Sequence, residues 1–208
     1  MIWLGVFFFV TLLMGVPIAF VMGISALGYF VATDHLRFLL AVPQRMFAGQ
    51  DSFILLAIPL FVLAGNLMDV GGLTQRLVGF ANSLVGRFRG GLSLTAIWGS
   101  FLFGGVSGSA AADAAALGTV LSPELKRQGY QEDYSAALIG VSSIMAPLVP
   151  PSIAMILYGA LSGTSISRLF VAGIVPGVIL AVILSAYAML IARKHGYPKL
   201  PAMSLAQI

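Results

Sequence analysis

The chain contains no cysteine in 208 residues. Disulfide bonds, thiolate metal sites and cysteine nucleophiles are therefore excluded, and thiol content carries no information about the cellular compartment. Charged residues are also scarce, at 9% of the chain, whereas hydrophobic residues make up 59%. Together with a mean hydropathy of +1.01, this composition lies far from that of a soluble domain and predicts an integral membrane protein.

The usual marks of an enzyme are missing as well. His35 and His195 are isolated in connecting segments, the apolar runs hold no paired carboxylates, and there is no glycine-rich phosphate loop with a lysine. We therefore expect no enzymatic activity and no cofactor, and in the absence of an ATP site an ion gradient is the natural energy source. The net charge of +4 is better explained by membrane topology than by nucleic-acid binding, because the cations are scattered among membrane segments.

Long charge-free runs dominate the sequence. A helix needs about 20 apolar residues to cross the hydrocarbon core, and five runs approach or exceed that length: 2–33, 52–68, 90–112, 134–167 and 169–192. These runs predict an all-α membrane protein, a bundle of several spanning helices. The first run has no basic residue before Arg37 and is too long for a signal peptide.

The first 91 residues are expected to hold spanning helices and an interfacial arm. We interpret 2–31 as one long tilted helix kinked near Pro17, with two short helices as the alternative. Residues 34–50 fit a connecting segment at the membrane interface, and 52–70 a second span. Apolar residues recur at three- and four-residue intervals between 73 and 88, which predicts an amphipathic helix over about 72–89, with Thr74 as a candidate N-cap. It would lie along the membrane surface as an anchor or stiff arm, or serve only as a solvated connector.

A stretch of very small residues, 104–118, lies between two apolar segments that are too short to span a bilayer. Residues 92–106 correspond to about 22 Å of helix, against a hydrocarbon core of about 30 Å. Ser107-Gly108-Ser109 could turn the chain inside the membrane, so that 92–121 forms a re-entrant hairpin. The alternative is a single helix over 91–121, in which Gly104 and Gly108 serve helix packing.

Charge counting favours the hairpin. Re-entry places eight cations on one side, namely Arg76, Arg87, Arg89, Lys126, Arg127, Arg193, Lys194 and Lys199. Only Arg37, Arg45 and Arg168 remain on the other side. A single crossing would instead divide the cations seven to four, so the positive-inside rule favours re-entry with the hairpin mouth in the cytoplasm.

A second interruption falls within the charge-free run 134–167, at Pro147-Leu-Val-Pro-Pro-Ser152. Adjacent prolines remove backbone donors and clash with the preceding turn, so a discontinuous helix is expected over about 134–162. The break would free carbonyl groups at the end of 136–146 and amides at the start of 153–161, which transporters use to hold cations and anions respectively. A proline-kinked structural helix is the alternative.

Four sequence blocks together resemble a known family. They are Gly105-Val-Ser-Gly-Ser-Ala-Ala-Ala-Asp-Ala-Ala-Ala-Leu-Gly118, Pro123 through Gly129-Tyr130, Val149-Pro-Pro-Ser152 and Leu169-Phe-Val-Ala-Gly-Ile-Val-Pro-Gly177. In order and spacing they are similar to the large membrane subunit of the tripartite ATP-independent periplasmic (TRAP) transporters. The resemblance covers the amino-terminal half of that subunit, whose second, inverted repeat is absent from this sequence, and 193–208 is similar to the start of an inter-repeat linker.

This resemblance implies a sodium-coupled elevator transporter that imports organic acids, such as C4-dicarboxylates or sialic acid, across the bacterial inner membrane. It implies a scaffold in 1–91, part of the transport domain in 92–162, and a further transmembrane helix in 163–192. It also implies three partners: a small membrane subunit, a periplasmic substrate-binding protein and the missing carboxy-terminal repeat. The alternatives are another hairpin-type carrier of tricarboxylates or divalent anions, and a non-transporting membrane scaffold.

The resemblance also implies a binding site. A sodium ion and one wall of the substrate site would be formed by Ser107, Gly108, Ser109, Ala110, Pro150, Pro151 and Ser152. Carbonyl and hydroxyl oxygens, which these segments can expose, are suitable ligands for a hard cation. Three residues are secondary candidates. Asp113 is either a functional intramembrane carboxylate or a helix-end stabiliser, and Ser142 and Ser143 are either further ligands or bonded to their own helix backbone.

Overall fold

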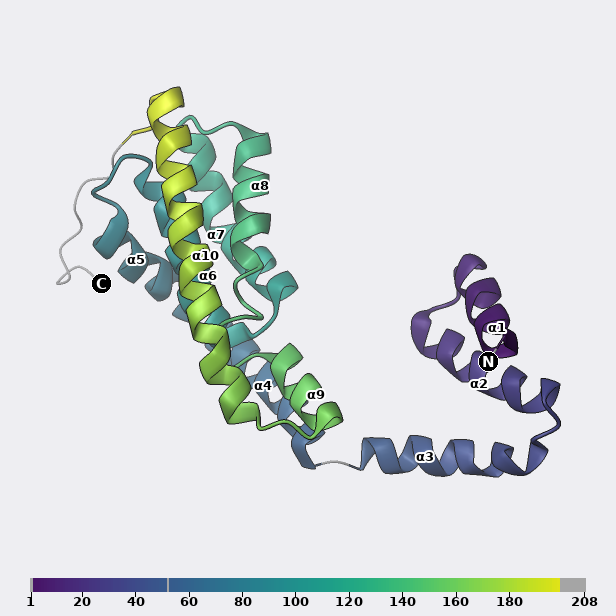
Figure 1. Cartoon of the computed structure of the whole chain (residues 1–208). Helices are drawn as coiled ribbons and strands as arrows, with labels where there is room; N and C mark the ends of the chain where they lie inside the picture. The colour runs from purple at the N-terminus through teal and green to yellow at the C-terminus, as the bar shows by residue number, and fades with distance from the viewer. Residues whose placement is uncertain (1, 52, 199–208) are drawn as a thin grey trace. The chain divides into compact units, whose positions relative to one another are not determined.

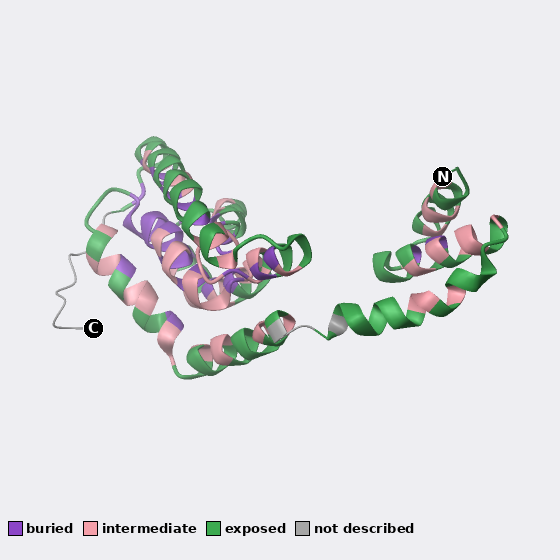
Figure 2. Cartoon of the chain, turned by 60° about the horizontal axis from the view of Figure 1, so that its bottom comes forward, coloured by how far each residue is buried: buried purple, intermediate pink, exposed green. Residues whose placement is uncertain are grey.

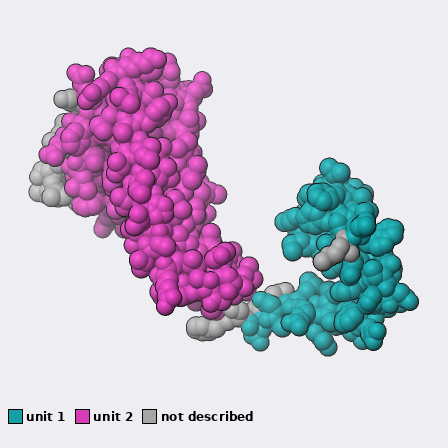
Figure 3. Space-filling view, viewed as in Figure 1, with its two compact units in different colours: residues 1–52 teal, residues 53–208 magenta. Residues whose placement is uncertain are grey.

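The computed structural model describes residues 2–51 and 53–198, and their regular secondary structure is helical (Figure 1). The chain separates into two compact units, residues 1–52 and residues 53–208, which are coloured separately in Figure 3. The all-α expectation is therefore confirmed. The predicted linker residues from 199 onward lie outside the described residues.

The first unit corrects one expectation. Residues 2–31 form two helices, α1 (Ile2–Leu13) and α2 (Ile18–Ala32), so the interpretation as one kinked helix is wrong. Gly15 adopts a left-handed conformation, with φ +76°, and Pro17 then starts the next helix. The two helices pack on each other, because a Cβ on Gly28 would lie 2.7 Å from the ring of Phe7. The physical reason is that Gly15 permits a full reversal of the chain, where Pro17 alone would only bend it.

Residues 34–50, expected as a connecting segment, are largely helical. They form the 3₁₀ helix η1 (Leu36–Leu40), which leads directly into α3 (Ala41–Gln50).

The described part of the second unit, residues 53–198, contains seven helices. In chain order they are α4 (Phe53–Val70), α5 (Leu73–Val85), α6 (Gly91–Ser107), α7 (Ala110–Arg127), α8 (Glu132–Ser143), α9 (Ile153–Ser162) and α10 (Ile166–His195). Helix α6 is central, since most of its residues are buried and it packs against α4, α5, α7, α8 and α10. Figure 2 shows buried residues gathered along this part of the unit.

Small residues allow the helices of this unit to approach closely. A Cβ on Gly104 of α6 would lie only 2.7 Å from the Cα of Ala146, which follows α8. Such contacts are typical of membrane helices, because lipid is as apolar as leucine and association depends on close packing rather than on the removal of water.

Helix α10 differs from α6 in length and exposure. Its 30 residues correspond to about 45 Å, and many apolar side chains, including Val171, Val175 and Ile183, face outward. Among the described helices, α10 alone has by itself the length and hydropathy of a membrane span. It covers most of 163–192, the segment in which the sequence predicted a further transmembrane helix.

The amphipathic helix α5 is present, with a different start from the one predicted. Gly72, in a left-handed conformation, occupies the N-cap position, while the Thr74 hydroxyl donates a hydrogen bond to the Asp69 carboxylate. Thr74 as N-cap is therefore wrong. The buried side of α5 includes Thr74 and Ala81, whereas Phe80 and Leu84 from the apolar stripe are exposed.

Candidate functional site

The predicted turn after Ser107 is confirmed. Helix α6 ends at Ser107, Gly108 is left-handed with φ +59°, and extended Ser109 is the N-cap of α7. Gly108 supplies the positive φ, which other residues adopt at a cost of about 1–2 kcal/mol. The Ser109 Oγ accepts a hydrogen bond from the Ala112 N–H at 3.5 Å, which satisfies one of the free amides at the start of α7.

Helices α6 and α7 fold back on one another as an antiparallel pair. Ser100 on α6 donates a hydrogen bond to Asp113 on α7, and further from the turn Gly99 lies opposite Leu117. The alternative of one continuous helix over 91–121 is therefore wrong. The second arm is longer than expected, because α7 continues through Pro123 to Arg127 instead of ending near residue 121.

The predicted break in the second span is also confirmed. Helix α8 ends at Ser143, residues 144–151 form turns, and α9 begins after the extended residue Ser152. Fully buried Ser152 caps α9, since its Oγ accepts a hydrogen bond from the Met155 N–H at 3.3 Å. A merely kinked helix does not describe a gap of this length.

The hairpin tip and the break lie against each other. A Cβ on Gly108 would be 2.7 Å from the carbonyl oxygen of Pro151 and 3.2 Å from the amide nitrogen of Ile153. A Cβ on Gly105 would be 3.2 Å from the carbonyl oxygen of Pro150. The structure thus brings Gly108 together with Pro151 and Ser152, and Gly105 together with Pro150, and only a glycine fits at position 108.

The other two tip residues flank this contact. The Ser107 Oγ accepts a hydrogen bond from the Ser109 N–H at 3.4 Å, and Ala110 is the first residue of α7. Both residues are partly exposed, so the tip retains surface available to a ligand.

Three helix ends meet at this place, since α6 arrives with its C-terminus while α7 and α9 leave with their amide-rich N-termini. The break that follows α8 adds the carbonyl oxygens of Pro150 and Pro151, which lie against Gly105 and Gly108. The free carbonyl groups carry partial negative charge and the free amides partial positive charge. The arrangement therefore offers oxygen ligands for a cation and hydrogen-bond donors for an anion within one small region.

The break also packs on α10. A Cβ on Gly173 would lie 2.4 Å from the carbonyl oxygen of Leu148, and one on Gly177 would lie 3.6 Å from the side chain of Val149. Glycines on α10 therefore make room for the unwound segment, so that its backbone lies directly against the long helix.

Asp113 is fully buried one turn into α7. The Ser100 hydroxyl donates a hydrogen bond to its Oδ2. Its Oδ1 has no hydrogen-bond partner among the described residues. Asp113 thus joins α6 to α7 behind the tip.

Ser142 and Ser143 are both buried but point to different surroundings. Ser143 Oγ donates to the carbonyl oxygen of Ile139 at 2.8 Å, as expected for a serine bonded to its own helix. Ser142 Oγ has no partner among the described residues, and Ser142 lines a small cavity beside α10 together with Leu138 and Leu184. The structure therefore does not bring Ser142 to the hairpin tip.

A cavity of about 410 Å³ opens beside the tip. Ser107 and Ser109 line one wall, Ile153 contributes the start of α9, and α4 forms the facing wall with Asn66 and Asp69. The sequence interpretation did not assign the α4 residues to a site. The sequence nevertheless contained a pattern that could have indicated them, because two polar residues three positions apart share one face of an otherwise apolar helix.

The ligand types at this place are mainly oxygen atoms. Across residues 2–51 and 53–198, no group of three or more His, Asp or Glu side chains forms a metal site. Carbonyl and hydroxyl oxygens, which the tip and the break carry, are ligand types that a hard cation prefers.

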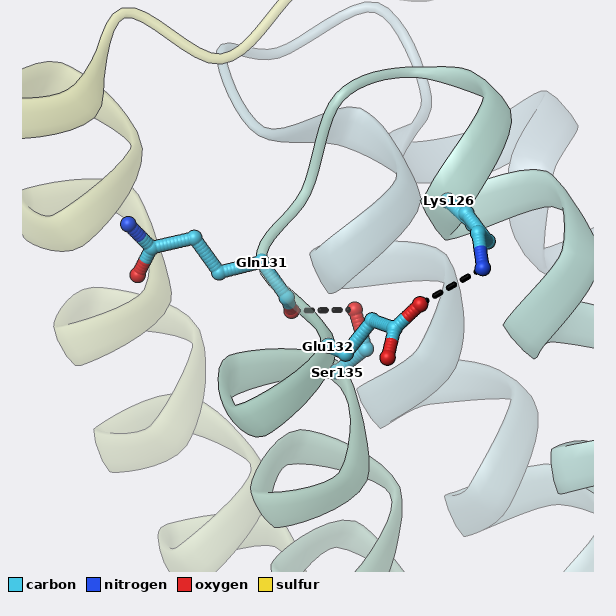
Figure 4. A network of polar contacts seen from close by, with 4 residues as sticks. All are labelled: Lys126, Gln131, Glu132 and Ser135. Carbon is cyan, nitrogen blue, oxygen red and sulfur yellow. Dashed lines mark hydrogen bonds and ion pairs between the residues drawn. The ribbon is translucent and has the colours of Figure 1, made fainter.

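The opposite end of the hairpin carries an exposed ion pair and a partly buried hydrogen bond (Figure 4). Lys126 Nζ contacts Glu132 Oε1 at 2.6 Å, and Ser135 Oγ donates to the carbonyl oxygen of Gln131 at 2.9 Å. The hydrogen bond between Lys126 and Glu132 has the larger effect on their pKa values, and the attraction of their opposite charges adds to it. Both raise the pKa of Lys126 and lower the pKa of Glu132. Both side chains are largely exposed, so solvent screens the pair.

Comparison with known proteins supports the resemblance read from the sequence. The profile of the family described as "Tripartite ATP-independent periplasmic transporter, DctM component" matches residues 5–208. The "Sialic acid TRAP transporter permease protein SiaT" of Haemophilus influenzae (strain 86-028NP) is 40% identical over 208 residues, covering 100% of this chain and 33% of that protein.

Two further relatives differ in the substrate that their names state. The "Sialic acid TRAP transporter large permease protein SiaM" of Vibrio cholerae is 41% identical, covering 97% of this chain and 46% of that protein. The "C4-dicarboxylate TRAP transporter large permease protein DctM" of Rhodobacter capsulatus is 35% identical, covering 94% of this chain and 48% of that protein. The chain thus spans between a third and about half of the length of these relatives.

Proposed function

The chain belongs to the DctM-component family of the tripartite ATP-independent periplasmic transporters, and from this premise we propose that it forms one half of a sodium-coupled permease for organic acids. The permease would lie in the bacterial inner membrane as a multi-pass protein. The paired α6–α7 hairpin would enter the membrane from the cytoplasmic side and turn back at Gly108.

The contact between Gly108 and Pro151 is the observation that carries this proposal. At this contact the C-terminus of α6 and the carbonyl oxygen of Pro151 lie beside the serine-capped, amide-rich starts of α7 and α9. Sodium would bind the carbonyl and hydroxyl oxygens of Ser107–Ala110 and Pro150–Ser152. The carboxylate of the substrate would be held by backbone amides and by the hydroxyls that line the neighbouring cavity.

The close packing of this region suits an elevator mechanism. Hairpin, break and α10 are joined by glycine contacts at positions 104, 108 and 173, so they can move together as a transport domain. In this proposal the amino-terminal helices belong to the scaffold. A small membrane subunit, a periplasmic substrate-binding protein and a carboxy-terminal repeat complete the system.

Serine substitutions in the intact permease, reconstituted with its partner subunits, test the site. We expect Ser107→Ala, Ser109→Ala and Ser152→Ala each to reduce sodium-dependent uptake of labelled sialic acid or C4-dicarboxylate by about tenfold or more, since each removes an oxygen ligand. Ser162→Ala is the matched control, because the hydrogen bonds of the exposed Ser162 join it to its sequence neighbours, the carbonyl oxygen of Tyr158 and the amide of Thr164. Normal uptake by all three variants would refute the site.

Single-cysteine labelling separates a transporter from a non-transporting scaffold. Because the chain has no cysteine, a cysteine introduced at Ser109 is a clean probe for this region. A water-soluble thiol reagent should modify it, and sodium or substrate should slow the reaction. An unreactive Ser109→Cys variant, in protein that inserts normally, would instead favour a packing role for the small residues.

A further inference from the structure

Three arginines line one cavity at the end of α10. Arg87 and Arg89 come from the turn between α5 and α6, and Arg193 comes from the last turn of α10. The cavity measures about 480 Å³, and its remaining lining residues are Phe88 and Met189. It therefore combines three cationic groups with apolar side chains, well away in sequence from the hairpin tip.

The backbone builds this arrangement. Gly90 is left-handed, with φ +71°, and a Cβ there would lie 2.5 Å from the Cβ of Ala192. Because Gly90 has no side chain, the turn that carries Arg89 packs directly on α10, next to Arg193. The cluster thus follows from a specific close approach of two elements.

The arginines lack acidic partners in the part of the chain that the structure describes. The two ion pairs of the described residues, Lys126–Glu132 and Arg127–Glu124, both lie near the turn between α7 and α8. Arg87 contacts an aromatic ring, with its Cζ 5.1 Å from the centroid of Phe88. Three like charges around one cavity repel each other, so a bound anion would stabilise them.

The position of the cavity indicates the source of that anion. Helix α10 has the length and hydropathy of a membrane span, and Arg193, Lys194 and His195 occupy its last turn. This end therefore lies where the hydrocarbon layer meets the headgroups. Leu190 is 63% exposed and Phe88 is 45% exposed, which provides an apolar surface for acyl chains beside the cations.

From these observations we propose that Arg87, Arg89 and Arg193 form a binding site for the phosphate headgroup of an anionic phospholipid, with its acyl chains along Phe88, Met189 and the exposed face of α10. Basic pockets at the membrane interface bind such headgroups, and arginine can hold phosphate oxygens through two parallel hydrogen bonds. A cation cluster that only sets topology would show no preference among lipids.

Lipid binding to the intact, detergent-purified permease tests this proposal. We expect native mass spectrometry to show retention of phosphatidylglycerol over phosphatidylcholine, and Arg87→Gln/Arg89→Gln/Arg193→Gln to lower phosphatidylglycerol affinity by about tenfold or more. The control Arg76→Gln/Lys126→Gln/Arg127→Gln removes the same charge from other exposed positions and should keep the preference. Equal retention of the two lipids, or equal losses in both triple variants, would overturn the proposal.

Two further arms keep the result interpretable. Arg87→Lys/Arg89→Lys/Arg193→Lys keeps the charge and should retain part of the preference for phosphatidylglycerol. If the triple glutamine variant fails to fold, the single variant Arg89→Gln replaces it and should also weaken phosphatidylglycerol binding. Inorganic phosphate at millimolar concentration should not displace phosphatidylglycerol. Displacement by phosphate alone would identify a small-anion site and overturn the assignment to lipid.

Discussion

The two helix interruptions in the second unit are built from residues of opposite backbone freedom, and both lead into a capped helix. At the hairpin tip the chain turns through Gly108, the most permissive residue, whereas at the break it passes through Pro150 and Pro151, the most restrictive. Yet each is followed by an extended serine whose hydroxyl accepts a hydrogen bond from the amide three residues later. The common result is a serine-capped helix N-terminus, which either backbone device can supply.

The interruptions differ one turn further on. Four residues after the capping Ser109 stands Asp113, which is buried against Ser100, whereas four residues after Ser152 stands the buried apolar residue Ile156. The hairpin is therefore fixed by a polar link and the break by apolar packing. Substitutions at matched positions can test how far this comparison holds.

The largest effect is expected from Gly108→Ala. The new Cβ would meet the Pro151 carbonyl oxygen at 2.7 Å, and a backbone atom cannot easily move away. Together with the cost of a left-handed alanine, we expect a loss of roughly 3 kcal/mol of stability and loss of uptake. Thermal unfolding and uptake assays measure the two effects.

Gly163→Ala is the control for backbone strain. Gly163 also has a positive φ, +70°, but nothing lies within 4 Å of its Cβ position. It should lose only about 1–2 kcal/mol. Equal effects at the two positions would mean that the contact between tip and break contributes little.

Asp113→Ala should have the next largest effect. It leaves the Ser100 hydroxyl without its acceptor in a buried position, at a cost of about 1–3 kcal/mol. Asp113→Asn keeps an acceptor oxygen and should recover part of the loss in thermal unfolding. If alanine and asparagine behave alike, the polar link does not distinguish the hairpin from the break.

The two capping serines should differ moderately. Ser152→Ala removes a fully buried cap and should cost about 1 kcal/mol, while Ser109→Ala removes a longer, partly exposed hydrogen bond and should cost less. Glycine replacements, which cost only a few tenths of a kcal/mol at caps, serve as controls in the same unfolding assay. A greater loss of stability for Ser109→Ala than for Ser152→Ala would contradict the expected order of the two caps.

The smallest effect is expected at the far end of the hairpin. Lys126 lowers the pKa of Glu132 below its ordinary value of 4.5, so the pair stabilises the fold above that pH and loses its contribution as pH falls through the lowered pKa. Because both groups are exposed, Lys126→Gln should change the melting temperature little at neutral pH. Melting curves recorded between about pH 6 and pH 3 should converge for wild type and variant at the acidic end.

The sequence predicted both interruptions because each has a local cause. Glycine at 108 and adjacent prolines at 150 and 151 change the backbone wherever they occur, so the turn and the break could be placed before any contact was known. The meeting of tip and break was expected only from the resemblance, because close approach depends on tertiary packing at Gly104 and Gly108.

Other features depended on context that a pattern does not carry. The reversal at Gly15 was interpreted as a kink at Pro17, because a glycine in an apolar run fits either structure until the second helix packs on Phe7. Thr74 is of a residue type favoured at helix N-caps, but its hydroxyl donates a hydrogen bond to the Asp69 carboxylate instead. The α4 wall of the cavity was missed because Asn66 and Asp69 gain their position only when α4 packs beside the tip.

The glycine contacts on α10 have a consequence for the depth of the break. Arg168 and Arg193 mark the two polar ends of the long helix, and the unwound segment lies against Gly173 and Gly177. At about 1.5 Å per residue, Gly177 is about 13 Å along the helix from Arg168 and about 24 Å from Arg193. The break therefore lies nearer to the Arg168 end of α10 than to the Arg193 end. In the proposed permease, this asymmetry would place the break closer to one membrane face than to the other.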